Sequence, residues 1–326
     1  MNRASPGRRR TLANASPGVG AAGPRPAAGV RRSWLDSPRT LAFLLMLPAT
    51  LLMGGVLAYP VVRVAWMSLT DLVLSAPASG QFIGIKNYLD ALGDPQFRHS
   101  LGRTIYFALT TVPVETALGL AIALLLNQKF PLHNVVRGLV LLPWALPYVV
   151  NGTMWRWIYD ANYGALNALL VQLGIVSEYQ IWLGEPTSAF VALVVANIWK
   201  ETPVAVILIH AALQTIPVEL YEAAMVDGAG AWRRFTAITL PLLQPVIAVT
   251  LAIKTVWALK EFDLVYVITR GGPANATNLL TYHTYLTTFK FLRFGYGAAL
   301  AVLLGVAAFV VAVLYVRTLR APEAEA

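Results

Sequence analysis

Residues 222–245 read EAAMVDGAGAWRRFTAITLPLLQP and lie between two long apolar segments. Glu219 and Glu222 stand where the positive end of a short helix dipole is expected. Pro217 fits the first turn of that helix, because proline lacks an N–H that the first turn leaves unpaired anyway. Gly228 predicts the end of the helix, since a helix C-terminus often needs a residue in the left-handed conformation. We therefore expect a short helix on a loop, placed where it could dock into another protein.

The composition is that of a membrane protein. Hydrophobic residues make up 57% of the 326 residues and charged residues only 13%, with a mean hydropathy of +0.61. Such a chain is far too apolar for a soluble domain of this length. Cysteine is absent, which excludes disulfides and thiolate metal sites. No metal site is expected from the histidines either, which lack metal-ligand spacing; they are His99, His133, His210 and His283.

A basic segment precedes the apolar ones. The first 40 residues contribute +7 of the net charge of +9, from eight arginines and one aspartate. A basic chain can bind nucleic acid, but this Ala/Gly/Pro/Arg-rich segment is typical of a disordered tail. We expect residues 1–40 to be a disordered cytoplasmic tail, with no nucleic-acid partner.

Six apolar runs are long enough to cross a bilayer core of about 30 Å at 1.5 Å per residue. They lie near residues 41–68, 104–127, 136–158, 189–212, 245–268 and 295–316. The sequence thus predicts an all-α membrane domain over residues 41–318, with six transmembrane helices, followed by a short tail over 319–326.

Lysine and arginine set the expected orientation. With the N-terminus inside, fourteen basic residues fall in inner segments and six in outer ones, as the excess of cytoplasmic positive charge in membrane proteins requires. The connection 159–188 has no lysine or arginine. We therefore predict that both termini and the loop 215–245 are cytoplasmic.

Charged side chains interrupt the apolar spans. On an insertion scale each costs roughly 2.5–3.5 kcal/mol at the centre of a lipid-facing helix, so these side chains should face protein or a water-filled cavity. Arg63 and Glu115 are expected to form a structural ion pair or to line the outer vestibule. In the fifth span, one hypothesis is an ion relay of a secondary transporter and another is a set of structural ion pairs. The residues concerned are Lys254, Lys260, Glu261 and Asp263.

Helical spacing arranges polar and aromatic residues in three stripes. Within each stripe the residues stand three or four apart on the third, fourth or fifth span, and so share one helix face. The stripes reach the middle of their spans, which is the depth of many transport sites. The candidate substrate contacts are Trp144, Tyr148, Asn197, Lys200, Glu201, Lys254, Ala258 and Glu261. Trp155, Trp157 and Trp182 are interpreted instead as an interfacial aromatic belt.

Residues 222–245 resemble the EAA loop of binding-protein-dependent ABC importers. Further stretches are similar to the sugar permeases of this group: FIGIKNY at 82–88, LPWALP at 142–147, YGALN at 163–167 and FDLVY at 262–266. The chain thus looks like the permease subunit of a carbohydrate importer, close to maltose, trehalose or glycerol-phosphate permeases. The residues that the resemblance assigns to coupling with the ATPase are Glu222, Ala223, Ala224, Asp227, Gly228 and Ala229.

The resemblance implies a type I importer permease (MetI-like) fold in a bacterial or archaeal cytoplasmic membrane. The implied partners are a second homologous permease, a cytoplasmic ABC ATPase dimer, an extracytoplasmic solute-binding protein, membrane lipid and a di- or oligosaccharide. The sugar contacts that it implies fall on the eight candidate positions above. Lys and Glu stand at four positions where the maltose permease has small or neutral residues, which suggests a different polar ligand or a neutralised, water-filled path.

No catalytic residue is expected in this chain. A phosphate-binding loop G-x-x-x-x-G-K-[ST] is absent, since none of the six lysines follows a glycine. ATP and Mg²⁺ are therefore expected in the partner ATPase, and this chain should hold no cofactor.

Overall fold

The computed structural model describes residues 37–128 and 130–320. Most of the tail expected over 1–40, and residues 321–326, lie outside this description, and the first helix already begins at Pro38. The described chain forms two units, one up to Ala58 and one from Tyr59 onward. Its residues are helices and their connections, with one isolated β-bridge between Thr70 and Phe82.

The first unit contains α1 (Pro38–Met53) and the π-helical turn η2 (Gly54–Ala58). Pro38 stands in the first turn of α1, where its missing N–H costs nothing. The second unit begins with α2 (Tyr59–Met67). Residues Pro38–Met67 are long and apolar enough to cross a membrane, which confirms the first predicted span.

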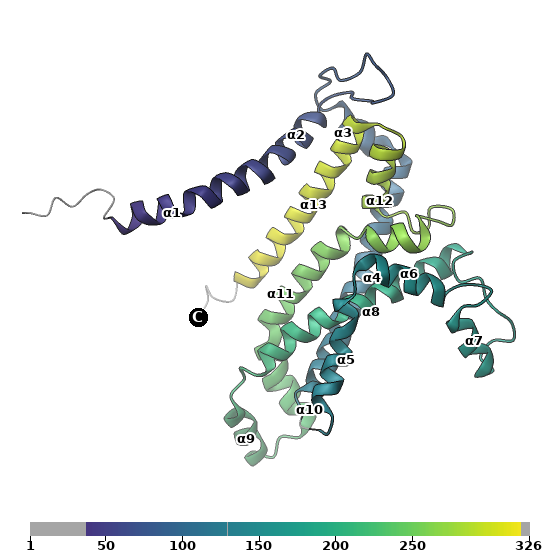
Figure 1. Cartoon of the computed structure of the whole chain (residues 1–326). Helices are drawn as coiled ribbons and strands as arrows, with labels where there is room; N and C mark the ends of the chain where they lie inside the picture. Colours follow the sequence, from purple (N-terminus) through teal and green to yellow (C-terminus); the bar gives the residue numbers. More distant parts are fainter. Residues whose placement is uncertain (1–36, 129, 321–326) are drawn as a thin grey trace, which may run out of the picture. The chain divides into compact units, whose positions relative to one another are not determined.

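The second unit holds the rest of the helices (Figure 1). In chain order they are α3 (Lys86–Gly93), α4 (Pro95–Leu126), α5 (His133–Ala145), α6 (Tyr148–Ile158), α7 (Ala165–Gln172), α8 (Pro186–Leu213), α9 (Val218–Val226), α10 (Ala231–Arg234), α11 (Leu240–Leu259), α12 (Leu280–Tyr285) and α13 (Phe294–Arg320), with π-helical turns η3 (Phe235–Thr239), η4 (Val265–Thr269) and η5 (Leu286–Lys290).

The hydropathy prediction holds for the long helices. Within the described residues, five helices could cross a membrane, or six if the bent pair α5–α6 is one span. Helix α4 starts nine residues before the predicted span at 104, because Asp94 caps it: the Asp94 carboxylate accepts the Gln96 N–H at 2.8 Å. In the most apolar stretch of helix α8, 61% of the residues are buried, more than in any other candidate span. Helix α8 therefore lies at the centre of the bundle.

The third predicted span is not one straight helix. Helices α5 and α6 are bent by 99° at the break between them. Leu146 is extended there, with ψ of 136°, as expected for the residue before a proline. Pro147 has no N–H to continue the hydrogen bonding of α5. The third predicted span, near 136–158, thus consists of two helices joined at the break and not of one continuous helix.

The fifth predicted span is displaced along the chain. Helix α11 ends at Leu259, not near residue 268. The carboxylate of Glu261 accepts the Leu264 N–H at 2.9 Å and so begins the next helical segment. Lys260, Glu261 and Asp263 consequently follow α11 instead of lying on it, and the helical spacing that joined Glu261 to Lys254 does not apply.

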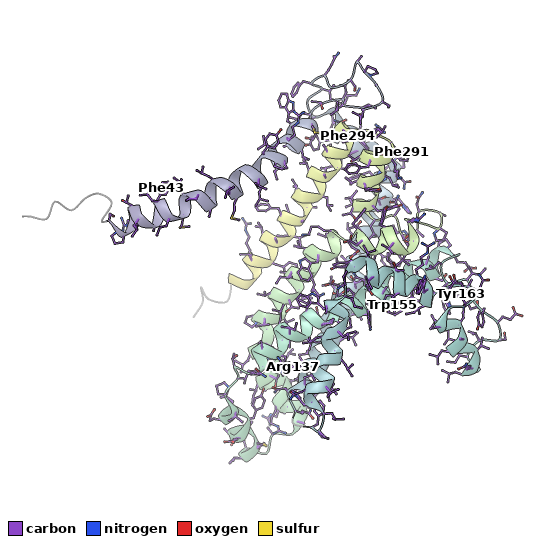
Figure 2. The ribbon with its side chains drawn as sticks, in the orientation of Figure 1. Phe43, Arg137, Trp155, Tyr163, Phe291 and Phe294 are labelled. Carbon is purple, nitrogen blue, oxygen red and sulfur yellow. The ribbon has the colours of Figure 1, made fainter. Side chains whose placement is uncertain are left out.

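The core lies where α4, α8 and α11 contact one another. Phe107, Leu193 and Leu264 are fully buried in its main cluster, and a second cluster contains Leu126, Ile209 and Leu243. Helices α9 and α10 lie at one end of this bundle and α12 at the other (Figure 1). Figure 2 shows Arg137 on α5 toward the α9 end, whereas Trp155 on α6 lies beyond the bend.

Candidate functional site

A cluster of buried charges occupies the contact region of α4, α8 and α11. Lys254 is 1% exposed, and its Nζ lies 3.0 Å from Glu115 Oε2 and 2.9 Å from Glu201 Oε2. The same ammonium donates to the backbone carbonyl of Glu201 at 2.6 Å and lies 5.5 Å from the ring centroid of Trp257. One lysine thus compensates two carboxylates from two helices, which is what a low-dielectric interior demands of buried ions.

Glu201 also fixes the start of α6. The Tyr148 hydroxyl donates to Glu201 Oε1 at 2.5 Å, a short contact that is typical of a bond to an ionised acceptor. Tyr148 is the first residue of α6. The carboxylate of Glu201 therefore links the bent span to Lys254 and α11.

Lys200 points to a different place from its neighbour Glu201. Its Nζ donates to the carbonyls of Pro143, Trp144 and Leu146 at 3.3, 2.8 and 2.5 Å. These carbonyls lie at the C-terminal end of α5 and in the break that follows. Lys200 is 2% exposed, so its ammonium group is compensated by the backbone carbonyls of the bent span.

Glu261 has neutral partners. Asn197 donates from Nδ2 to Glu261 Oε2 at 3.3 Å, and the Leu264 N–H donates to Oε1. The Glu261 carbonyl accepts from the Thr281 hydroxyl. Asn197 and Glu261 are both buried, so the predicted proximity of the two residues is present although Glu261 lies beyond the helix.

A small cavity of about 20 Å³ lies among these groups. A water molecule needs roughly 10–15 Å³, so the cavity has room for about one water and none for a sugar ring. Six of the eight candidate contacts line it, together with Glu115 and Trp257, which were not among the candidates. The lining residues are Glu115, Tyr148, Asn197, Glu201, Lys254, Trp257, Ala258 and Glu261.

The other expectations for charged and aromatic residues have mixed outcomes. Trp144 is 50% exposed and does not line the cavity, and neither does Lys200. Arg63 is exposed and Glu115 pairs with Lys254, so the expected Arg63–Glu115 pair is wrong. Glu115 was recognised as a carboxylate in an apolar span but was given the wrong partner, and Trp257 could have been found by its spacing of three from Lys254.

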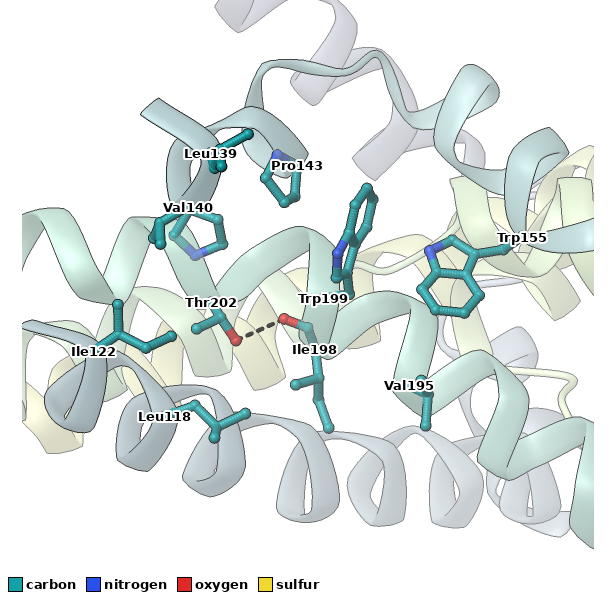
Figure 3. Close-up of a pocket in the computed structure, with 11 residues that line it drawn as sticks. Leu118, Ile122, Leu139, Val140, Pro143, Trp155, Val195, Ile198, Trp199 and Thr202 are labelled. Atoms are coloured by element: carbon teal, nitrogen blue, oxygen red, sulfur yellow. Dashed lines mark hydrogen bonds between the residues drawn. The ribbon is translucent and has the colours of Figure 1, made fainter. Parts of the chain in front are cut away.

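A larger apolar pocket of about 390 Å³ lies beside the bend (Figure 3). Pro143 of α5 and Trp155 of α6 face it from the two sides of the break, and Leu118 and Thr202 from α4 and α8. The rings of Trp155 and Trp199 pack edge to face, with 5.7 Å between their centroids. Of the predicted aromatic belt, Trp155 thus lines a pocket, Trp182 donates to Asn167 Oδ1 at 2.9 Å, and Trp157 is 65% exposed.

The loop 215–245 contains the expected short helix. Helix α9 covers Val218–Val226, and Pro217 is the residue just before it, one position earlier than the first turn. Gly228 has φ of +76°, and the Ala229 N–H donates to the Ala224 carbonyl at 2.8 Å, so the helix ends in the predicted left-handed turn. No residue of α9 is buried, and Val226 is 89% exposed.

The family model described as "Binding-protein-dependent transport system inner membrane component" matches residues 115–321. This range contains the charged cluster from Glu115 onward, the bent span and α9. The chain belongs to this family.

The proteins similar to this chain are named for different transported compounds. The sulfoquinovosyl glycerol permease SmoG of Agrobacterium fabrum is 41% identical over 291 residues, 89% of this chain and 94% of that protein. The trehalose/maltose permease MalF of Thermococcus litoralis is 39% identical over 280 residues, 85% and 92% of the two chains. A solved bacterial ABC transporter involved in the import of alginate matches with TM-score 0.77 at 23% identity, over 88% of this chain and 98% of that one.

These comparisons make the chain a multi-pass inner-membrane permease subunit of a sugar ABC importer with a MetI-like fold. A permease subunit of this family is a transport component and not an enzyme. The hypothesis of an ion-coupled secondary transporter does not fit this membership. Lys260 and Asp263, which it needs beside Lys254 and Glu261, are exposed and outside the cavity.

Proposed function

We propose that this permease moves a di- or oligosaccharide of the trehalose or maltose type into the cell, driven by a separate ATPase that docks on α9. The observation that carries the coupling part is the exposed helix α9, which has no buried residue and is followed by the left-handed turn at Gly228. Met225 and Val226 are 51% and 89% exposed, and exposed apolar side chains together on one short helix favour burial in a partner.

The coupling contacts are assigned to the end of α9. Glu222 offers an exposed carboxylate, and the left-handed Gly228 lets the chain turn away so that the helix can enter a cleft. The residues proposed for this contact are Glu222, Ala223, Ala224, Asp227, Gly228 and Ala229. ATP and Mg²⁺ belong to the ATPase dimer in this proposal.

Three further partners complete the proposed transporter. A second homologous permease supplies the other half of the pathway, and an extracytoplasmic solute-binding protein delivers the sugar. The surrounding lipid covers the remaining exposed apolar side chains, such as Leu45 and Phe309 at 72% and 70% exposure.

The sugar-binding site is proposed at the charged cluster in an opened form. Tyr148, Asn197 and Glu261 offer hydroxyl, amide and carboxylate groups to sugar hydroxyls. The cavity of about 20 Å³ is closed to a sugar, so helices must separate before the ligand enters, as in alternating access. Glu201 and Lys254 are engaged with each other in the closed form and become available when it opens, with Ala258 beside them.

ATP hydrolysis by the complete complex tests this function. The permease is purified with its second permease, ATPase and binding protein, and hydrolysis is measured with a panel of neutral and acidic sugars. We expect stimulation by at least one di- or oligosaccharide, and no stimulation in a Gly228→Pro complex that assembles normally. A complex that no sugar stimulates, or a Gly228→Pro complex with full stimulation, would contradict the proposal.

A further inference from the structure

The break between α5 and α6 interrupts the backbone hydrogen bonding inside a membrane-spanning segment. The Pro143 carbonyl accepts only a long bond from the Leu146 N–H at 3.4 Å, and the carbonyls that follow it face the break. Helix α5 ends at Ala145 and α6 starts at Tyr148, and Pro147 can donate no hydrogen bond. Unpaired carbonyls are costly in a bilayer, where water cannot reach them, so broken helices occur only where protein groups satisfy the freed backbone.

Lys200 meets this need from α8. Three N–H donors of one ammonium match three carbonyls, those of Pro143, Trp144 and Leu146, at 2.5–3.3 Å. A cation at the C-terminal end of a helix also interacts favourably with the helix dipole. The ammonium lies 4.7 Å from the ring centroid of Tyr148, on the far side of the break, which adds a cation–π contact.

Adjacent residues of α8 thus hold the two sides of the bend. Lys200 binds the carbonyls on the α5 side, and Glu201 accepts the hydroxyl of Tyr148 on the α6 side. Only the second contact involves the cavity, because Lys200 does not line it.

We infer that Lys200 is a positioning residue that sets the 99° bend of the third span, and is not a sugar contact. It maintains the bend by satisfying the carbonyls of the break, and the bend in turn brings Tyr148 to Glu201. Glu201 is shared with Lys254 of α11, whereas the carbonyls held by Lys200 are not. Separation of α11 from α8 breaks the Lys254–Glu201 pair but leaves both sides of the bend attached to α8, through Lys200 on one side and through the Tyr148–Glu201 bond on the other.

The distance between two spin labels across the bend tests this inference without a sugar or ATP. The chain has no cysteine, so Val135→Cys on α5 and Trp157→Cys on α6 label only these exposed positions (56% and 65% exposed). With a rise of 1.5 Å per residue and the bend of 99°, the two Cα atoms are about 21 Å apart at the observed bend and would be roughly 33 Å apart in a straight helix.

Four complexes are compared by pulsed electron paramagnetic resonance: the parent, Lys200→Met, Lys200→Arg and Lys260→Met. The parent and Lys260→Met, which removes an exposed lysine outside the break, should give one narrow distance distribution. Lys200→Met should broaden it toward longer distances, by up to about 12 Å. Lys200→Arg keeps the donors and the charge and should restore the narrow distribution.

An unchanged distribution in Lys200→Met overturns the inference. Should that variant fail to assemble, Lys200→Gln takes its place, since its shorter amide cannot reach three carbonyls, and an unchanged distribution there is equally decisive. The proposed import function is independent of this outcome, because it is judged by sugar-stimulated ATP hydrolysis of the parent complex. Failure of one therefore leaves the other standing.

Discussion

Removal of Lys254 should destabilise the assembled permease more than removal of any one of its carboxylate partners. In Lys254→Met, Glu115 and Glu201 lose their shared cation, although their side chains are only 3% and 5% exposed. Breaking a buried ion pair by deleting one partner costs about 3–5 kcal/mol. In Glu115→Gln, by contrast, Lys254 keeps Glu201 at 2.9 Å and the Glu201 carbonyl at 2.6 Å, so the cost should be about 1 kcal/mol, that of one hydrogen bond.

Thermal unfolding of the purified complex measures this order. A loss of about 3 kcal/mol corresponds to a fall of roughly 6 °C or more in the apparent Tm. The matched control is Lys260→Met, six residues along, whose exposed side chain should change stability by less than about 0.5 kcal/mol. The double variant Lys254→Met/Glu115→Gln should be more stable than Lys254→Met alone, because one uncompensated carboxylate has been removed.

Two results would refute this reasoning. If Lys254→Met unfolds at the same temperature as Lys260→Met, the buried pairs contribute no net stability. If the double variant is less stable than Lys254→Met by the full cost of Glu115→Gln, the two sites are independent and the 3.0 Å contact has no energetic counterpart.

Three further predictions concern coupling, topology and substrate. Gly228→Ala should lower sugar-stimulated ATP hydrolysis but not assembly, since alanine at φ of +76° is strained by roughly 1 kcal/mol or more; equal stimulation would contradict the role of the turn. Single cysteines at Gly230 should be labelled only from the cytoplasm and those at Gly80 and Ile175 only from outside; cytoplasmic labelling of Ile175 would overturn the predicted orientation. Asn197→Ala, which removes a 3.3 Å bond to Glu261, should reduce transport at least tenfold while assembly stays near the parent level; loss of assembly in proportion to transport would mean that the residue is structural.

Features that depend on local sequence were predictable. The long apolar runs place the spans, because hydrophobicity over about 20 residues decides insertion irrespective of contacts. Gly228 ends α9 as predicted, since the left-handed turn is a property of a few consecutive residues. The polar stripes also identified Tyr148, Asn197, Glu201 and Lys254 as residues of one cluster, because a buried charge needs partners at its own depth.

Features that depend on distant partners were not predictable from the sequence. A proline pair marks a weak point in the third span, but the 99° bend also needs Lys200, which is more than fifty residues away along the chain. The end of α11 at Leu259 depends on Glu261 accepting the Leu264 N–H, and hydropathy does not register such a cap. Glu115 pairs with Lys254 and not Arg63 because packing of α4 against α11 decides which cation is near.

The closed cavity and the ion pairs around it together constrain how a sugar can reach the site that we propose. A cavity of about 20 Å³ cannot admit a sugar while Lys254 joins α4, α8 and α11 and Tyr148 joins α6 to them through Glu201. Entry therefore requires that some of these contacts separate, and water or sugar hydroxyls must then replace each lost partner, since isolated charges are costly in this environment. A hydroxyl-rich ligand can do this at every position, donating to carboxylates and accepting from the ammonium. In the site that we propose, the same charges that close the cavity are thus the groups that would bind a sugar once it opens.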